Sequence, residues 1–174
     1  IALQETFPDQ AKSIQRELGF EYGFVTECDC TRNGDELAIL SRHPILEAEE
    51  VEVDPKGGRL IVAQVQVEGE PIRFMNAHLP VPTTPFTYPT RERAYDRVTE
   101  VVQSSSQRTV LVGDFNTTVW SPSLSEFHGD TREQLVNVAE GRVSEASWCH
   151  WFIFFGCLRI DHIFVAVSYT HLTL

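Results

Sequence analysis

The sequence predicts a single α/β domain in which β-sheets pack together and helices lie on the outside. Three observations lead to this prediction. The 174 residues and the hydrophobic content of 42% suit one domain with a substantial core. Apolar side chains alternate along residues 59–67, as in a half-buried strand. Residues 91–103 instead repeat apolar side chains at helical spacing.

The chain begins with a short strand followed by a helix. Residues 1–5 resemble the end of a strand, and Pro8 and Asp9 open a helix in which Asp9 is the expected N-cap. Gly19 is expected to end this helix. Apolar side chains repeat on one helical face, at Ala11, Ile14 and Leu18.

Several strands follow, separated by short turns rich in Gly and Asn. They are expected at residues 20–27, 37–40, 45–53, 59–67 and 72–79. The turns at residues 32–35 and 56–58 are short, so consecutive strands should pair antiparallel.

The second half mixes helices and strands. A loop rich in Pro and Thr spans residues 81–90 and precedes the helix at 91–103. A buried strand follows at residues 109–112, and Trp120-Ser121-Pro122 starts a short helix. The last two strands are expected at residues 147–155 and 159–165.

The chain is acidic. Asp and Glu total 25 against 14 Lys and Arg, giving a formal net charge of −11. This excess opposes broad electrostatic attraction to nucleic acid. It is compatible with a phosphate substrate bridged through a metal, because an acidic metal site adds to the same total. No membrane helix or signal peptide is visible, and the compartment stays open.

The four cysteines form no Cys-x-x-Cys pair; they are Cys28, Cys30, Cys149 and Cys157. This spacing disfavours a zinc-binding interaction module built from them and His150. One disulfide is compatible with the sequence, although we expect buried thiols.

The tetrapeptide Gly113-Asp114-Phe115-Asn116 leaves the end of the predicted strand at residues 109–112. On an extended backbone Asp114 and Asn116 point to the same side. A carboxylate acceptor and an amide donor placed together can orient a water and hold a phosphate oxygen. Gly, Asp and Asn are also ordinary turn residues, so the tetrapeptide alone equally fits a strand exit.

Three other ionisable residues lie at predicted strand ends, where sites between sheets form. His78 shares a face with Asn76 and could donate to a phosphate oxygen or protonate a leaving group. Glu5 ends an apolar strand, so it must lie at a rim, be paired, or bind metal. Asp161 and His162 point to opposite faces, so Asp161 would orient a histidine from elsewhere. Each also has a structural interpretation, as a rim glutamate, a core-edge histidine or a paired carboxylate.

Five segments, in order, resemble the motifs of the endonuclease/exonuclease/phosphatase family, which includes deoxyribonuclease I, abasic-site endonucleases, neutral sphingomyelinases and inositol-polyphosphate phosphatases. The segments are residues 3–6, 37–45, 76–79, 113–116 and 159–163. They extend over nearly the whole chain. Trp120-Ser121-Pro122 and the Pro-rich segment after His78 resemble the bacterial branch of this family.

The resemblance implies a four-layer α/β sandwich of the deoxyribonuclease I type, with two packed sheets flanked by helices. It also implies phosphate-ester hydrolysis that depends on Mg²⁺, with Mn²⁺ as an alternative. Glu5 matches the family's metal-binding glutamate. Asp114 matches the aspartate that orients or deprotonates water, and Asn116 the asparagine that steadies the phosphate. His78 matches a phosphate-contacting histidine, and Asp161 a carboxylate that orients a second histidine.

We therefore expect a metal-dependent phosphodiesterase of the nuclease type. A phosphatase, a sphingomyelinase-type phospholipid hydrolase and a catalytically dead domain of the same fold are the alternatives. The substrate is expected to be a nucleic acid, a phospholipid head group or an inositol phosphate, and no protein partner is implied. The loop at residues 81–90 is expected to border the site.

Residues 1–166 are expected to form a partial domain that is incomplete at both ends. The family's first strand carries an asparagine near the metal, and its last loop carries a Ser-Asp-His-type motif; we find neither. His162 and His171 lie outside that motif. Residues 167–174 resemble a translated sequencing adapter, so a non-native tail is expected. For these reasons we expect the chain to be weakly active or inactive.

Overall fold

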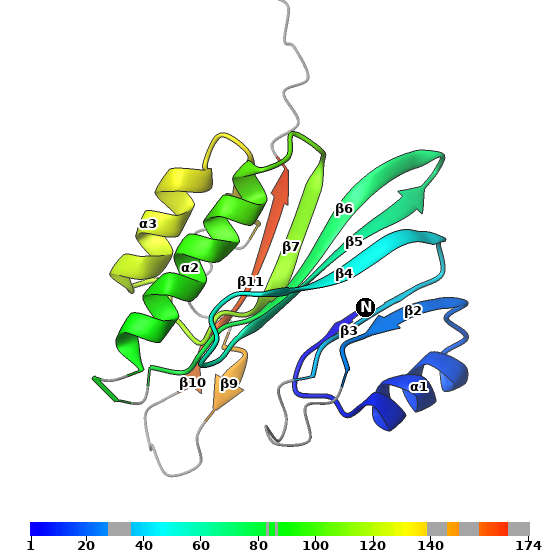
Figure 1. The fold of residues 1–174 in the computed structure, drawn as a ribbon, viewed down its shortest axis with the longest axis horizontal. Helices are drawn as coiled ribbons and strands as arrows, with labels where there is room; N and C mark the ends of the chain where they lie inside the picture. Colours follow the sequence, from blue (N-terminus) through cyan, green and yellow to red (C-terminus); the bar gives the residue numbers. More distant parts are fainter. Residues whose placement is uncertain (28–35, 83, 86, 139–145, 150–156, 167–174) are drawn as a thin grey trace, which may run out of the picture.

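The computed structural model describes residues 1–27, 36–82, 84–85, 87–138, 146–149 and 157–166. Helix α1, a three-stranded sheet, a six-stranded sheet and the pair α2–α3 form four successive layers (Figure 1). The four-layer sandwich expected from the resemblance is confirmed. The expected tail at 167–174, most of the expected strand at 147–155, and Cys28, Cys30 and His150 lie outside the described residues.

The smaller sheet has the antiparallel order β1-β3-β2 and lies against α1. Its strands are β1 (Ala2–Leu3), β2 (Tyr22–Val25) and β3 (Ala38–Ser41). Strand β1 is shorter than the predicted residues 1–5, β2 occupies only the middle of residues 20–27, and β3 has the predicted length but is shifted by one residue.

Helix α1 (Pro8–Glu17) begins two residues earlier than the predicted N-cap at Asp9 requires. Phe7 is the N-cap, and its backbone N–H donates to Gln10 Oε1 at 3.2 Å. Asp9 lies in the first turn, so its prediction as the N-cap was wrong. Leu18, predicted to share a helical face with Ala11 and Ile14, is the C-cap of the helix and is 53% exposed. Gly19 does end the helix, with a left-handed φ of 67°.

The larger sheet has the order β4-β5-β6-β7-β11-β8. Its strands are β4 (Ile45–Glu52), β5 (Arg59–Val67), β6 (Glu70–His78), β7 (Thr109–Asp114), β8 (Leu135–Asn137) and β11 (Asp161–Ala166). Neighbours pair antiparallel except β6 and β7, which are parallel because helix α2 (Tyr88–Gln103) crosses between them. The short β8 was not predicted.

Three further differences from the prediction concern connections. The strands β3 and β4 belong to different sheets, so the expected antiparallel pairing of consecutive strands fails there. Helix α2 starts at Tyr88, inside the expected loop at 81–90. A disulfide joins Cys149 to Cys157 between β9 (Trp148–Cys149) and β10 (Cys157–Leu158), where thiols were expected.

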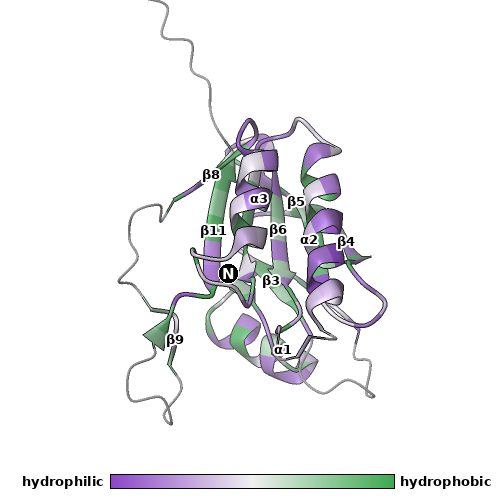
Figure 2. Ribbon diagram, turned by 90° about the vertical axis from the view of Figure 1, so that its left-hand side faces the viewer, coloured by the Kyte–Doolittle hydropathy of each residue, from purple (hydrophilic) through white to green (hydrophobic). Residues whose placement is uncertain are grey.

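Two apolar cores hold the layers together. One lies between the large sheet and the helices α2 and α3 (Pro122–Thr131), which cross one face of that sheet (Figure 2). Its aromatic centre consists of Tyr95, Phe115, Phe127 and Phe164. The other lies between the sheets and comprises Leu37, Ile39, Ile61, Ala63 and Val65. Among the described residues, no helix is long and apolar enough to cross a membrane.

One fully buried polar side chain connects the two sheets. Asn76 on β6 donates from Nδ2 to Leu3 O at 2.9 Å and to Ala38 O at 3.0 Å, both in the smaller sheet. Its Oδ1 accepts a hydrogen bond from Gln4 Nε2. Asn76 therefore aligns the smaller sheet with the end of β6, and an apolar residue of the same size could not do so.

Replacing Asn76 with alanine should lower the free energy of unfolding by about 2–3 kcal/mol, because buried carbonyls and an amide would lose their partners. Urea unfolding measures this change. Gln66→Ala removes an exposed amide from β5 and should change stability by less than about 0.5 kcal/mol. Equal effects of the two substitutions would show that Asn76 does not join the sheets.

Candidate active site

Three neighbouring strands place His78, Asp114 and Asp161 side by side. In the parallel pair β6–β7, His78 lies opposite Asp114. In the antiparallel pair β7–β11, Asp161 lies opposite the same Asp114. Adjacent strands are about 4.8 Å apart, so the two flanking residues lie on either side of Asp114 within about 10 Å of each other. The structure thus brings together three of the five predicted site residues in one row.

Glu5 comes to this row from the other sheet. It follows β1 in a turn with φ of 52°, and its Oε1 lies 3.8 Å from His78 Nε2. The Glu5 side chain is 69% exposed, whereas that of His78 is 9% exposed. The carboxylate therefore lies at an open rim beside a buried imidazole.

Asn116 reaches the site differently from the prediction. Strand β7 ends at Asp114, and Asn116 has a left-handed φ of 49°, so the extended geometry assumed for the pair was wrong. The turn still joins the two residues, because the Asn116 backbone N–H donates to Asp114 Oδ1 at 2.7 Å. Asn116 Nδ2 donates to Leu79 O at 2.8 Å, which leaves one N–H of the amide for another acceptor.

The surroundings of Asp114 favour its protonated form. Burial, with smaller contributions from the negative charges of Asp161 and Glu5, raises the pKa of Asp114 to about 6. The Asn116 N–H and the charge of His78 act in the opposite direction. A carboxyl with a pKa near 6 can exchange protons with water close to neutral pH.

The oxygen donors at this site suit a hard cation. Mg²⁺ binds through one or two carboxylates and retains several waters. Glu5 offers one such exposed carboxylate at the rim. Within the described residues, however, no group of three or more His, Cys, Asp or Glu side chains has a geometry that could hold a metal ion. A carboxylate oxygen is nevertheless the kind of ligand that Mg²⁺ prefers, and the exposed carboxylate of Glu5 would be the one to hold such an ion.

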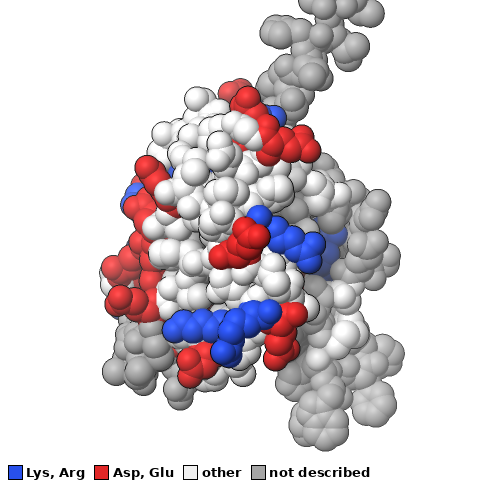
Figure 3. All heavy atoms as spheres, turned by 90° about the vertical axis from the view of Figure 1, so that its right-hand side faces the viewer, with Lys and Arg blue, Asp and Glu red and all other residues white. Residues whose placement is uncertain are grey.

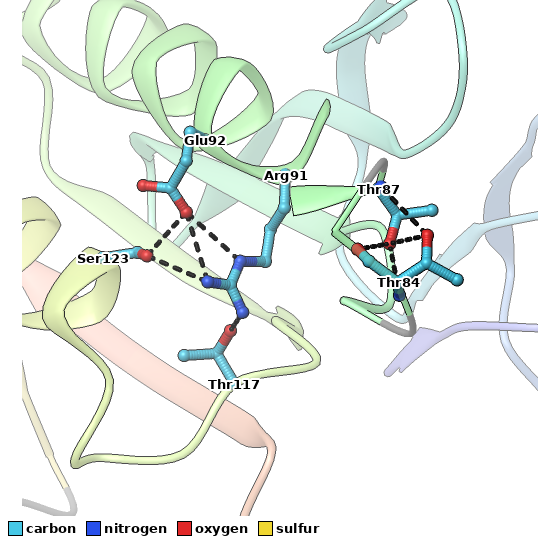
Figure 4. A network of polar contacts seen from close by, with 6 residues as sticks. All are labelled: Thr84, Thr87, Arg91, Glu92, Thr117 and Ser123. Carbon is cyan, nitrogen blue, oxygen red and sulfur yellow. Dashed lines mark hydrogen bonds and ion pairs between the residues drawn. The ribbon is translucent and has the colours of Figure 1, made fainter. Parts of the chain in front are cut away.

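A buried arginine that the sequence analysis did not identify supports the segment after Asn116 (Figure 4). Arg91 at the start of α2 donates from Nη1 to Thr117 Oγ1 at 3.4 Å and from Nη2 to Ser123 Oγ at 3.2 Å. Ser123 Oγ also donates to Glu92 Oε1 at 2.7 Å, and Arg91 pairs with the same carboxylate. We call Arg91, Glu92, Thr117 and Ser123 the Arg91 cluster. The sequence offered one signal for the burial of Arg91: a charged residue that adjoins the apolar stripe of the predicted helix.

His162 supports the same segment from β11. Its Nε2 lies 2.7 Å from Thr117 O, and its ring packs edge-on against Phe115. Burial lowers the pKa of His162, so the ring is neutral and donates from Nε2. His162 faces the helix-side core while Asp161 lies in the site row, as the alternation of the strand predicted. His162 therefore supports the turn at residues 115–117 and does not face a phosphate in the site row.

Gly113 permits the close approach of β7 and β6 on which the row depends. A Cβ at Gly113 would lie 1.9 Å from Ala77 O and 2.7 Å from Ala77 C, both backbone atoms. Its φ of 152° is also one that residues with a Cβ rarely adopt. Only glycine allows the pairing that sets His78 opposite Asp114.

The model of the Endonuclease/Exonuclease/phosphatase family matches residues 1–170. The chain belongs to this family. The proteins of this family are phosphoester hydrolases of the nuclease and phosphatase kind. No curated protein sequence matches the chain.

Solved structures of the family share its fold. D. rerio TDP2 complexed with a single-strand DNA product has a TM-score of 0.76 and 17% identity, over 98% of this chain and 71% of that one. The human Nocturnin catalytic domain with bound sulfate has a TM-score of 0.67 and 15% identity, over 95% and 68%. An endonuclease/exonuclease/phosphatase from Beutenbergia cavernae has a TM-score of 0.68 and 20% identity, over 95% and 53%.

Gly113→Ala should destabilise the chain by about 3 kcal/mol or more, because its Cβ would overlap the Ala77 backbone. Gly129→Ala is the matched control, since nothing lies within 4 Å of a Cβ there and the residue is inside α3. It should stabilise the chain by about 0.5–1 kcal/mol. Thermal unfolding of both variants measures the difference, and a neutral Gly113→Ala would contradict the close approach.

Asp114→Asn should stabilise the metal-free chain at pH 8. The folded pKa of about 6 exceeds the ordinary value of 3.8, so the folded state binds this proton more tightly than the unfolded state. The ionised carboxylate thus opposes folding above pH 6, and its effect disappears as the pH falls below 3.8. The expected gain at pH 8 is on the order of 1 kcal/mol after allowance for solvent screening.

Thermal unfolding with EDTA at pH 8 and pH 4 measures this effect. Asp96→Asn, at an exposed position on α2, should change stability little at either pH. A loss of stability in Asp114→Asn at pH 8 would contradict the proposed electrostatics of the row.

Proposed function

We propose that this chain is a metal-dependent phosphodiesterase of the nuclease type. The observation that carries the proposal is the position of Asp114, with His78 opposite it on one strand and Asp161 on the other, and with Glu5 facing the row from the second sheet. These residues come from four separate segments, so their convergence does not follow from local sequence. Family membership supports the same type of chemistry.

Asp114 is the proposed general base. Burial and the charge of Asp161 raise its pKa to about 6, so the carboxylate is ionised at neutral pH and accepts a proton readily. The Asn116 backbone N–H occupies Asp114 Oδ1, which leaves Oδ2 for a water. The free N–H of the Asn116 amide is placed to donate to a phosphate oxygen.

His78 is the proposed donor to the phosphate. Its Nε2 faces Glu5 Oε1 at 3.8 Å, and the residue lies opposite Asp114 on the neighbouring strand. An imidazole N–H that donates to a phosphate oxygen stabilises the negative charge that develops on a phosphorus with five oxygen substituents. His78 would therefore donate to the phosphate while Asp114 accepts a proton from the water.

Glu5 is the proposed ligand of Mg²⁺, with Mn²⁺ as an alternative metal. A bound divalent ion would polarise the phosphoryl oxygens and neutralise charge in the transition state. The exposure of Glu5 leaves room for metal-bound waters and for the substrate phosphate.

A nucleic acid is the proposed substrate class. The D. rerio TDP2 structure, which shares the fold over 98% of this chain, holds a single-strand DNA product. The human Nocturnin domain holds a sulfate, an anion of phosphate-like shape. Both support a phosphate site in this fold, and the first supports a nucleic-acid strand as its ligand.

The purified chain should hydrolyse bis-p-nitrophenyl phosphate with Mg²⁺ or Mn²⁺, and EDTA should remove the activity. Asp114→Asn should lower kcat/KM by about 100-fold or more, as expected for loss of a general base. Asp96→Asn should leave kcat/KM unchanged. Hydrolysis that survives both EDTA and Asp114→Asn would refute the proposal.

We expect the wild-type rate to be low. Only one imidazole, that of His78, lies in the described part of the site, because His162 is buried against Phe115 and bonded to Thr117. Steady-state kinetics with Mg²⁺ measure the rate. Fast turnover that Asp114→Asn abolishes would show that the arrangement is more complete than we propose.

A further inference from the structure

Trp120 is the most exposed large apolar side chain of the described residues, at 71%. It lies four residues after Asn116, a stretch that spans at most about 14 Å when fully extended. An indole left in water forgoes the stabilisation that burial would give it. The exposed ring is therefore available to a ligand that extends from Asn116.

The backbone on both sides of Trp120 is held in place. Val119 packs against the helix-side core, and the Ser121 N–H donates to Thr118 O at 3.0 Å. Thr117 and Ser123 both accept hydrogen bonds from Arg91 (Figure 4). The ring is thus presented by an anchored turn, which lowers the entropic cost of binding a ligand to it.

A second exposed aromatic ring is tied to the same arginine. Tyr88, the first residue of α2, is 44% exposed, and the Arg91 guanidinium lies 4.7 Å from its ring centroid. Before Tyr88, the Thr84 N–H donates a hydrogen bond to Thr87 Oγ1, and the Thr87 hydroxyl donates to Thr84 O. These hydrogen bonds close the turn that leads into α2. The starts of α2 and α3 lie at the same end of the molecule as the ends of β6 and β7 (Figure 1).

We propose that Trp120 and Tyr88 form a stacking surface for unpaired nucleobases next to the scissile phosphodiester. This proposal rests on the proposed function and extends it to the features of the substrate that are recognised. Stacking on an aromatic ring contributes substantially to single-strand binding and tolerates any base. Arg91 contacts the Tyr88 ring directly and anchors the backbone segments on both sides of Trp120 through Thr117 and Ser123.

The charge of the chain favours bases over other ligands at these rings. With a net charge of −11, the protein lacks the broad electrostatic attraction that usually holds a phosphate backbone. Figure 3 draws the side of the molecule away from α2 and α3, and there too the basic side chains of the described residues stand in separate groups beside acidic ones. Arg91 itself is buried and paired with Glu92, so it is not available to a phosphate. Stacking on uncharged rings needs no basic surface.

A membrane surface fits these features less well. Interfacial binding draws on a wide apolar face together with Lys and Arg that attract anionic lipid. Here two rings stand on separate turns of an acidic protein. We therefore treat a lipid ligand as a result that would overturn the proposal.

Binding to a labelled single-stranded oligothymidylate of about ten nucleotides tests the proposal without catalysis. Fluorescence anisotropy would be measured on the Asp114→Asn chain in EDTA. Trp120→Ala should weaken binding about 10-fold, and Trp120→Phe should restore most of the affinity. Leu18→Ala, which removes an exposed apolar side chain from the end of α1, should have no effect. Equal affinity with and without the Trp120 ring would overturn the proposal.

The second measurement compares the oligothymidylate with an abasic strand of the same length. In the wild-type chain kcat/KM should be about 10-fold higher for the strand with bases, and Trp120→Ala should bring this ratio close to 1. A ratio near 1 in the wild type, or one that survives Trp120→Ala, would overturn the proposal. Trp120-dependent binding to phosphatidylcholine vesicles without binding to the oligonucleotide would also overturn it.

The two proposals fail in different ways. If bis-p-nitrophenyl phosphate and the oligonucleotide are both stable in the presence of the wild-type chain, the proposed hydrolase activity fails. The anisotropy experiment still decides the stacking surface, because it needs no turnover.

Discussion

The close approach of β7 to β6 at Gly113 is the constraint on which the candidate active site depends. It leaves no room for a Cβ against the Ala77 backbone. Strand β7 pairs with β6 on one side and with β11 on the other, so Asp114 lies between the imidazole of His78 and the carboxylate of Asp161. The row therefore depends on the register of both strand pairs, since the parallel neighbour β6 and the antiparallel neighbour β11 each place a site residue opposite Asp114. A shift of either neighbour by one residue would turn its side chain to the opposite face.

The site is assembled at a cost to stability that other contacts offset. Asp114 is half-buried beside Asp161, and its charged form is disfavoured in the folded state. The same features raise its pKa to about 6, where a carboxylate serves well as a base. Asn76 and the two apolar cores hold the sheets in place around this unfavourable group. Such an arrangement is typical of sites in which function opposes stability.

The two sheets and the helix layer contribute different components. The large sheet carries His78 and Asp114, the proposed base, and Glu5 follows β1 of the smaller sheet with an exposed carboxylate. Arg91 at the start of α2 contacts the Tyr88 ring and bonds to Thr117 and Ser123 on either side of Trp120. For an acidic chain this division is physically reasonable. A cation at Glu5 can bridge to phosphate, and uncharged rings can hold a base, so neither contact requires a basic surface.

Much of this was determined by the sequence alone. The alternation of residues 59–67 and the apolar stripe of α2 predicted packed sheets with helices outside, because periodicity is a local property. The family resemblance carried by the motifs around Glu5, His78, Asp114 and Asp161 implied the four layers and the residues of the row. The structure corrected Asn116, whose left-handed turn replaces the expected extended geometry, and Asp9, which Phe7 replaces as the N-cap.

Only the tertiary structure decided which strands are neighbours. The separation of β3 from β4 into different sheets, the parallel pairing of β6 with β7, the disulfide between Cys149 and Cys157 and the burial of Arg91 all depend on contacts between segments far apart in the chain. Local propensity carries no information on such contacts, since their free energy arises only when the layers pack. For the same reason Trp120 could be read from the sequence as a helix start, and its exposure became visible only in the fold.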